Sequence, residues 1–333
     1  MIMGKCLITK LNGSVQNDSL LRIGEFCIKV SKVESPTADT QRFVVNNSKD
    51  AQLRIIGDGY FTNETLSENK GKALNITANT ETTVYFSNGD FEIVVSEKYS
   101  LTQVGTYIRT SWKESKSKLS FDINLLKYSP NISFLAINGT KVTGDIAVLG
   151  KLTGLTHLTL ADTQVTGDIA VFGKLTGLTY LSFNTTKLTG DIAVFGKLTG
   201  LTKIPIINRT GVTGDIAVYK NCNFKTLQLL GTSVYGDLSV LPNNILWVQA
   251  DINTTGTFTW TGIKNRTNIL AVENCKCNKI DAFLNDMATL EAKFGGEQIW
   301  YKTISLIGTR TSASDAAVAT LQSKGYTVSI NPS

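Results

Sequence analysis

Histidine is almost absent, since the 333-residue sequence contains only His157. A Ser-His-Asp or Cys-His catalytic arrangement would therefore have to include that residue. The sequence also lacks a Gly-x-Ser-x-Gly segment, a Walker motif and a dinucleotide-binding glycine pattern. We therefore predict that the protein is not an enzyme, has no catalytic residues and uses no cofactor. Paired carboxylates for glycoside cleavage carry no local motif and are the alternative.

Long apolar runs are missing as well, because no run approaches the ~18 residues that a membrane-spanning helix needs. The opening MIMGKCLITKLNGS holds no apolar stretch of the length of a secretory signal. This favours synthesis and folding in a cytoplasm, without a membrane partner. The net charge of +6 is modest. Its lysines and arginines are scattered instead of clustered among aromatics, which argues against a nucleic-acid partner.

Cysteines are few and odd in number: Cys6, Cys27, Cys222, Cys275 and Cys277. An odd count in a chain without a secretory signal favours free thiols. Cys275 and Cys277 form a Cys-x-Cys, but a tetrahedral zinc site needs about four ligands, and His157 is distant in sequence. We predict small, partly buried thiols and no metal. Whether Cys275 and Cys277 have a role is an open question.

An internal repeat dominates what is present. The segments KVTGDIAVLGKLTGLTHLTL, QVTGDIAVFGKLTGLTYLSF and KLTGDIAVFGKLTGLTKIPI begin at residues 141, 164 and 187. Five Gly-Asp pairs recur at spacings of 23, 23, 24 and 22 residues. A period in the twenties with Leu-x-x-Leu-x-Leu spacing predicts a leucine-rich-repeat solenoid. The aspartates of these pairs are Asp145, Asp168, Asp191, Asp215 and Asp237.

Each repeat predicts a short strand and then a helical turn. Leu158 and Leu160 alternate as buried strand residues do. We expect Asp168 to cap a turn at 169–172 and Gly173 to end that turn with a positive φ. Successive coils would then stack at about 4.8 Å and form one parallel sheet on the concave side.

These repeats resemble the plant-type leucine-rich repeat, in which coils read Leu-x-Leu-x-x-Asn-x-Leu-x-Gly-x-Ile. In this sequence a threonine stands in each repeat at the position of the family's asparagine. Repeats with this threonine are similar to those of the BspA-like surface proteins of Bacteroides-type bacteria. A threonine hydroxyl can still bond a nearby carbonyl, with fewer bonds than an amide. The replacing residues are Thr140, Thr163, Thr186, Thr210 and Thr232.

The Gly-Asp column would bring five carboxylates close together, which is unfavourable unless they are neutralised. A calcium ladder is one explanation. N-capping, together with a lysine column, is the other. Because one aspartate per coil gives too few oxygens for a calcium ion, we favour capping. The lysines are Lys151, Lys174 and Lys197.

The concave side of the predicted sheet is the candidate binding surface, because residues flanking the inward leucines face outward. Rings beside hydroxyl and amide groups would suit a sugar or a peptide. Alternatively, Phe134, His157 and Tyr180 pack on one another as a cross-strand ladder. The candidate ligand-binding residues are Phe134, His157, Tyr180, Thr159, Ser182, Asp162 and Asn184.

The repeat pattern becomes irregular after Val240. There we expect irregular coils and a final unit that covers the exposed end of the solenoid core. Helical spacing of apolar residues predicts an amphipathic helix near 281–293. A second short helix would be opened by Ser312 or Ser314 and closed by Gly325.

The first third lacks the repeat and shows short β-rich runs separated by turn clusters. We predict an α+β chain with an antiparallel sandwich or barrel at 1–95, a polar connector at 96–118 and the capped solenoid at 119–333. The expected strands are 6–11, 25–32, 42–45, 52–56, 73–77, 82–87 and 91–95.

The opening MGKCLITKLNGSVQNDSLLRIGEFCIKV resembles the start of virion-surface proteins of crAss-like bacteriophages that infect Bacteroides. The resemblance implies a capsid-bound head fibre or decoration protein, attached to the major capsid protein or another virion protein through its β domain. The repeats would then adhere to a host or mucosal glycan or protein. Multiplicity strengthens weak contacts, so we expect a homo-oligomer, a trimer before a dimer. The alternatives are a bacterial cell-surface adhesion protein and an intracellular binding module.

Overall fold

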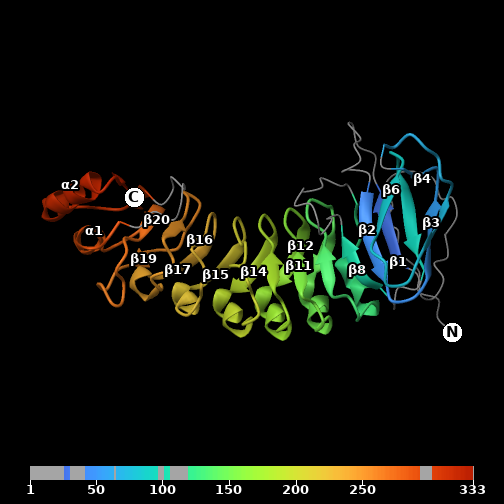
Figure 1. Ribbon diagram of the computed structural model, residues 1–333, viewed down its shortest axis with the longest axis horizontal. Coiled ribbons are helices and arrows are strands. Elements are labelled where there is room, and N and C mark those ends of the chain that lie inside the picture. Colours follow the sequence, from blue (N-terminus) through green and yellow to red (C-terminus); the bar gives the residue numbers. More distant parts are fainter. Residues whose placement is uncertain are drawn as a thin grey trace. The chain divides into compact units, whose positions relative to one another are not determined.

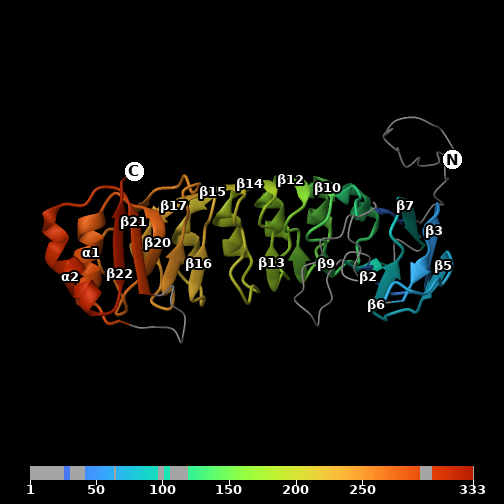
Figure 2. The same ribbon diagram turned by 90° about the horizontal axis from the view of Figure 1, so that it is seen from above.

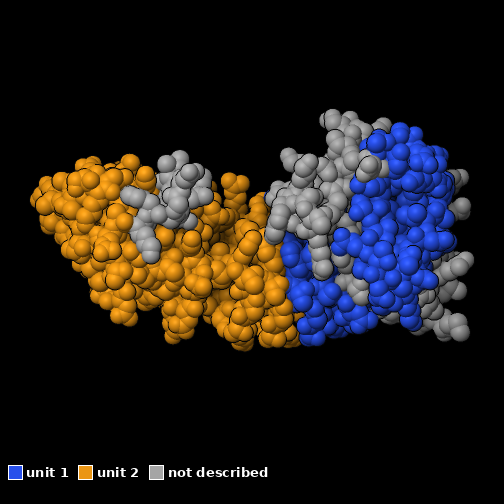
Figure 3. All heavy atoms as spheres, in the orientation of Figure 1, with its two compact units in different colours: residues 1–166 blue, residues 167–333 orange. Residues whose placement is uncertain are grey.

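The computed structural model describes residues 26–30, 42–63, 65–96, 101–105, 119–292 and 302–332. The chain forms two compact units, Met1–Thr166 and Gly167–Ser333, which Figure 3 colours separately. We call them unit 1 and unit 2. Within the described residues, no helix is long and apolar enough to cross a membrane.

The first part of unit 1 consists of two antiparallel sheets. Leu53 and Ile55 are buried while the residues between and beside them are more exposed, which is the period of a strand with one face in a core. Phe86 of one sheet and Phe91 of the other lie edge to face, 6.0 Å apart. The two sheets therefore share apolar contacts. One sheet has the order β1 (Phe26–Val30), β7 (Phe91–Val95), β3 (Ala51–Ile56), β5 (Ala73–Ile76). The other includes β4 (Phe61–Thr62), β6 (Thr82–Phe86), β2 (Arg42–Asn47) and β8 (Leu101–Gly105).

Six of the expected strands are present, as β1, β2, β3, β5, β6 and β7. The expected strand at 6–11 lies outside the described residues. The strands β4 and β8 were not expected. β8 falls within the segment 96–118 that the sequence suggests is a connector, and residues 106–118 lie outside the described part.

The solenoid begins in unit 1, directly on this β region. β9 (Phe134–Ala136) pairs in parallel with β8, with Val104 opposite Leu135. β11 (His157–Thr159) pairs with β9 in the same direction. On the next edge of the coil, β10 (Thr143–Asp145) pairs in parallel with β12 (Gln164–Asp168). Because β8 pairs with β9, the first strand of the solenoid has a neighbouring strand within unit 1 and does not form an open sheet edge.

Within unit 2, parallel strands lie along two edges of the coils, which Figure 1 shows side by side. The predicted parallel-stranded solenoid is therefore confirmed, but the expectation of one parallel sheet is wrong, because parallel strands lie on two edges of the coils and one of these edges is reduced to an isolated bridge at Ile206. One run consists of β14 (Lys187–Asp191), β15 (Gly211–Asp215), β17 (Ser233–Asp237) and β19 (Phe258–Thr259). The other consists of β16 (Thr226–Gln228), β18 (Trp247–Gln249), β20 (Ala271–Lys276), β21 (Thr303–Ile307) and β22 (Thr327–Asn331). β13 (Tyr180–Ser182) precedes them, and Ser182 forms an isolated parallel bridge with Ile206.

The predicted aspartate caps are confirmed. The Asp168 Oδ1 accepts a 2.8 Å hydrogen bond from the backbone N–H of Ala170, at the start of a 3-10 helix, η4 (Ile169–Lys174). Such a cap satisfies a helix N–H that has no partner inside the helix. The same bond opens η3 (Ile146–Lys151), η5 (Ile192–Lys197), η6 (Ile216–Tyr219) and η7 (Leu238–Val240), from Asp145, Asp191, Asp215 and Asp237.

The prediction for Gly173 is wrong, because η4 continues through it to Lys174. The positive φ falls instead on the glycine before each capping aspartate, at +117° for Gly190. A Cβ built on Gly190 would lie 2.2 Å from the Asp168 Oδ1. The glycine is thus required by close packing against the preceding cap, as well as by its backbone conformation.

The threonine column is buried and bonds locally, as predicted. The Thr186 hydroxyl donates to the Phe183 carbonyl at 2.7 Å. This bond satisfies a hydroxyl that would be costly to bury alone. Equivalent bonds of 2.6–2.8 Å are made by Thr140, Thr163, Thr210 and Thr232.

Two helices lie at the C-terminal end, beside β21 and β22 (Figure 2). The predicted helix at 281–293 exists as α1 (Ile280–Thr289). It ends early because Leu290 is extended and Glu291 pairs with Asn268 in a parallel bridge. The second predicted helix is α2 (Asp315–Ser323), preceded by a 3-10 turn and followed by Gly325 with a φ of +86°.

Candidate functional site

The predicted aromatic column begins in unit 1, where two of its rings pack on each other. Phe134 and His157 are opposite one another on β9 and β11. Their rings stack 4.3 Å apart with planes 11° from parallel, and Phe134 is 3% exposed. This arrangement corresponds to the cross-strand ladder that the sequence left as an alternative to a ligand platform.

The polar candidates of unit 1 divide between burial and exposure. The Thr159 hydroxyl donates to the Asn138 Oδ1 at 3.0 Å, and both side chains are buried. Asp162 is exposed and has a φ of +54°, a left-handed turn conformation that aspartate tolerates. Thus Thr159 is occupied by an internal bond, while Asp162 faces solvent.

The remaining candidates belong to unit 2. Tyr180 is half-buried on β13. Ser182 is buried, and its hydroxyl donates to the half-buried Asn184 Oδ1 at 3.1 Å. The structure therefore brings Ser182 and Asn184 together as a bonded pair.

A ladder of side chains that the sequence did not predict lies on another sheet of unit 2, the one that contains β16, β18 and β20. The Gln228 Nε2 donates to the Gln249 Oε1 at 3.2 Å, and the Gln249 Nε2 donates to the Glu273 Oε2 at 3.3 Å. At the other end, the Asn208 Nδ2 lies 3.5 Å from the Gln228 Oε1. We call Asn208, Gln228, Gln249 and Glu273 the amide ladder.

The strand register creates the ladder. Gln228 is directly opposite Gln249, which is opposite Glu273, on three parallel strands. Neighbouring strands lie about 4.8 Å apart, within reach of such side chains. A glutamate carboxylate accepts only, so it draws the Gln249 amide N–H toward itself and leaves the Gln249 oxygen facing Gln228. The ladder is consequently directional, with its acceptor end at Glu273.

The ladder is accessible, as a contact surface must be. Gln228 is exposed, while Gln249 and Glu273 are half-buried. Each glutamine amide carries two N–H groups, and the ladder bonds use one of them. The ladder therefore offers polar groups to a partner along a fixed row.

Sequence reasoning could have found this row only in part. Gln228 stands between Leu227 and Leu229, in the Leu-x-Leu pattern of a strand. Gln249 and Glu273 lie in coils whose sequences no longer align with the repeat. Their common register depends on loop lengths that the pattern does not specify.

No metal-ligand cluster occurs within the part of the chain that the structure describes, as judged from groups of three or more His, Cys, Asp or Glu. Cys275 and Cys277 are both buried and free. Burial raises the pKa of both thiols. They are therefore held as neutral thiols, which are poor nucleophiles and metal ligands.

No family model and no curated protein matches the chain. Partial likeness exists to solved structures. A plant ice-binding protein is 19% identical with a TM-score of 0.35, over 51% of this chain and 56% of the other. A TDR receptor is 18% identical with a TM-score of 0.40, over 65% and 38%. An internalin from Listeria monocytogenes is 17% identical with a TM-score of 0.36, over 72% and 85%. The chain thus spans little more than half of the first of these proteins and less than half of the second. Its assignment as a solenoid is based on the parallel strand pairing of its own repeats.

Proposed function

We propose that the protein is a non-enzymatic binding scaffold, and that the amide ladder of unit 2 is its contact surface for a protein or glycan. The observation that carries this proposal is the directional row from Asn208 to Glu273, of which Gln228, Gln249 and Glu273 lie on parallel strands. Amides provide donors and acceptors together, which suits a polypeptide main chain or sugar hydroxyls.

The experiment is adhesion of the purified, labelled full chain to Bacteroides cells and to mucin. The double variant Gln228→Ala/Gln249→Ala removes the two glutamines at the centre of the ladder. A matched control, Lys174→Ala/Lys197→Ala, changes two exposed residues that end the 3-10 helices. We expect the ladder variant to lose at least tenfold in affinity and the control to bind as the wild type. Equal binding by all three proteins would refute the proposed surface.

The setting that we propose is the virion surface, reached after synthesis in a host cytoplasm. The support is the resemblance of the opening residues to capsid-surface proteins of crAss-like phages. In this proposal the β region attaches to the major capsid protein or another virion protein, and a homo-oligomer displays the repeats. Mass spectrometry of purified particles tests it, because absence of the chain from particles would favour the bacterial cell-surface alternative.

A further inference from the structure

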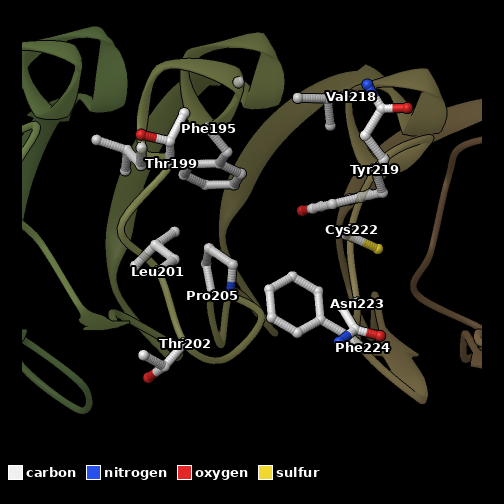
Figure 4. A pocket seen from close by; sticks show the side chains of 13 residues that line it. Phe195, Thr199, Leu201, Thr202, Pro205, Val218, Tyr219, Cys222, Asn223 and Phe224 are labelled. Atoms are coloured by element: carbon white, nitrogen blue, oxygen red, sulfur yellow. The ribbon is translucent and has the colours of Figure 1, made fainter.

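A cavity of about 480 Å³ opens between two consecutive coils of unit 2 (Figure 4). It lies between the coil that contains η5 and the coil that contains η6. Its walls include Phe195, Leu201, Pro205 and Phe224. Its volume falls in the range of about 300–1,000 Å³ that is typical of small-molecule sites.

The cavity arises where the repeat loses its register. The Gly-Asp spacing lengthens to 24 residues and then shortens to 22. Leu178 is fully buried, but its counterparts in the next two coils, Leu201 and Phe224, are half-buried. The position of buried Leu198 is taken by the smaller Cys222. The two coils therefore cannot close their shared core as the regular coils do.

One polar group is buried at this cavity. Tyr219 takes the position that phenylalanine holds in the two preceding coils, Phe172 and Phe195. It is 3% exposed, and its hydroxyl makes no hydrogen bond to any described residue. Tyr219 is among the residues that line the cavity, and Figure 4 shows its hydroxyl pointing toward the coil that contains Phe195, Leu201 and Pro205. A buried polar atom without a partner is uncommon and needs an explanation.

The lining restricts the chemistry of an occupant. No Lys, Arg, Asp or Glu is among the described residues that line the cavity. Burial raises the pKa of Tyr219, so its hydroxyl stays neutral and can donate. A charged ligand would lose its hydration without compensation.

We propose that this cavity binds a small, neutral, mainly apolar molecule through a hydrogen bond from the Tyr219 hydroxyl to an acceptor oxygen of the ligand. Tyr219, at the position of Phe172 and Phe195, provides the hydrogen-bond donor. The incomplete packing between the two coils provides the space for the ligand. The site is separate from the amide ladder and does not depend on the proposed adhesion.

The experiment uses two probes of similar shape, acetophenone and ethylbenzene, titrated into the full chain by ligand-observed NMR. Only acetophenone carries an acceptor oxygen. We expect the wild type to bind acetophenone about three- to tenfold more tightly, the ratio that one net hydrogen bond provides. Tyr219→Phe should lose this preference and bind acetophenone no more tightly than ethylbenzene, because the carbonyl oxygen then has no donor. Leu201→Trp, which fills the cavity from a half-buried position, should bind neither.

Three results would overturn the proposal. They are failure of the wild type to bind either probe, a preference for acetophenone that persists in Tyr219→Phe, and unchanged binding by Leu201→Trp. Circular dichroism and thermal melting confirm that each variant is folded. Tyr219→Phe removes only one unpaired atom, so it keeps the test decisive if Leu201→Trp is unstable.

Discussion

From Gly167 to Leu198 the chain buries its phenylalanine and leucine side chains almost completely, whereas Leu201 and Phe224, the counterparts of Leu178 in the next two coils, are partly exposed. Both stretches keep the aspartate cap and the threonine bond. The cap and the buried threonine therefore suffice to turn the chain. Close packing of the core is a separate property, which the sequence relaxes where the cavity forms.

A second contrast concerns the sheet face. In unit 1 Phe134 stacks on His157 and Thr159 donates to Asn138, so that most of the candidate side chains are engaged within the protein. In unit 2 the amide ladder presents the exposed Gln228 and the half-buried Gln249 and Glu273 in a row. The coils that follow the repeat most closely are thus structural, and the features open to ligands are found where the coils diverge.

The largest loss of stability is expected from a substitution in the core of the regular coils. Phe183 is fully buried, with its ring centroid 5.5 Å from that of Phe172 and 6.3 Å from that of Phe195. Phe183→Ala should lower the free energy of unfolding by about 3–5 kcal/mol, through lost burial and the void created. Phe224→Ala, at the cavity, should cost about 1–2 kcal/mol, because Phe224 is only half-buried. Urea denaturation measures both, and equal losses would remove the distinction between packed and open coils.

A smaller effect is expected at the glycine column. Gly190→Ala should destabilise by about 2–3 kcal/mol, because its φ is +117° and its Cβ would meet the preceding cap. Gly154→Ala is the matched control, since nothing lies within 4 Å of an added Cβ there. Thermal melting of the two variants checks this. A Gly190 variant as stable as the control would show that the Gly-Asp corner is not close-packed.

The smallest effect expected is a pH dependence at the C-terminal helices, where a polar network replaces the repeated cap. Hydrogen bonds from Ser314 Oγ at 2.6 Å and Thr311 Oγ1 at 2.7 Å, with Arg310 nearby, lower the pKa of Asp281. The folded-state pKa is below the unfolded value of about 3.9, so this stabilisation exists above that pH and is lost as the pH falls through the folded pKa. Asp281→Asn should therefore flatten the decline of stability below about pH 4.

Melting curves between pH 3 and pH 6 measure this effect. Ser314→Ala removes the strongest partner of Asp281 and should flatten the decline in the same direction. Wild-type and variant curves that run parallel in acid would contradict the role given to Asp281.

Much of the fold could be predicted from the sequence, because the repeat reports the same contacts several times. Asp168 and Thr186 recur in identical surroundings, and their roles as cap and internal donor follow from that recurrence. The prediction that Gly173 ends the helical turn is wrong because the residue at which a helix ends depends on how the next coil packs against it. The sequence of a single coil does not reveal that packing. The strand β8 was missed for a similar reason, since it depends on pairing with a strand about thirty residues away in sequence.

The candidate site was less predictable. The rows of Phe134 and Thr159 were placed on the correct strands, but whether neighbouring side chains satisfy one another is decided by tertiary contacts. Gln249 and Glu273 align only through the register of irregular coils. The unpartnered hydroxyl of Tyr219 needed the cavity to be seen, although the change from phenylalanine was visible in the sequence.

Site-specific photocrosslinking tests the central claim most directly. A photoreactive residue is placed at Gln228 or Gln249 on the ladder, or at Lys174 or Lys197 on the 3-10 helices of the same unit. After adhesion of the full chain to cells or mucin, we predict adducts from the two ladder positions and none from the two lysine positions. Adducts from the lysine positions alone would show that the partner binds another face of the solenoid and would contradict the account.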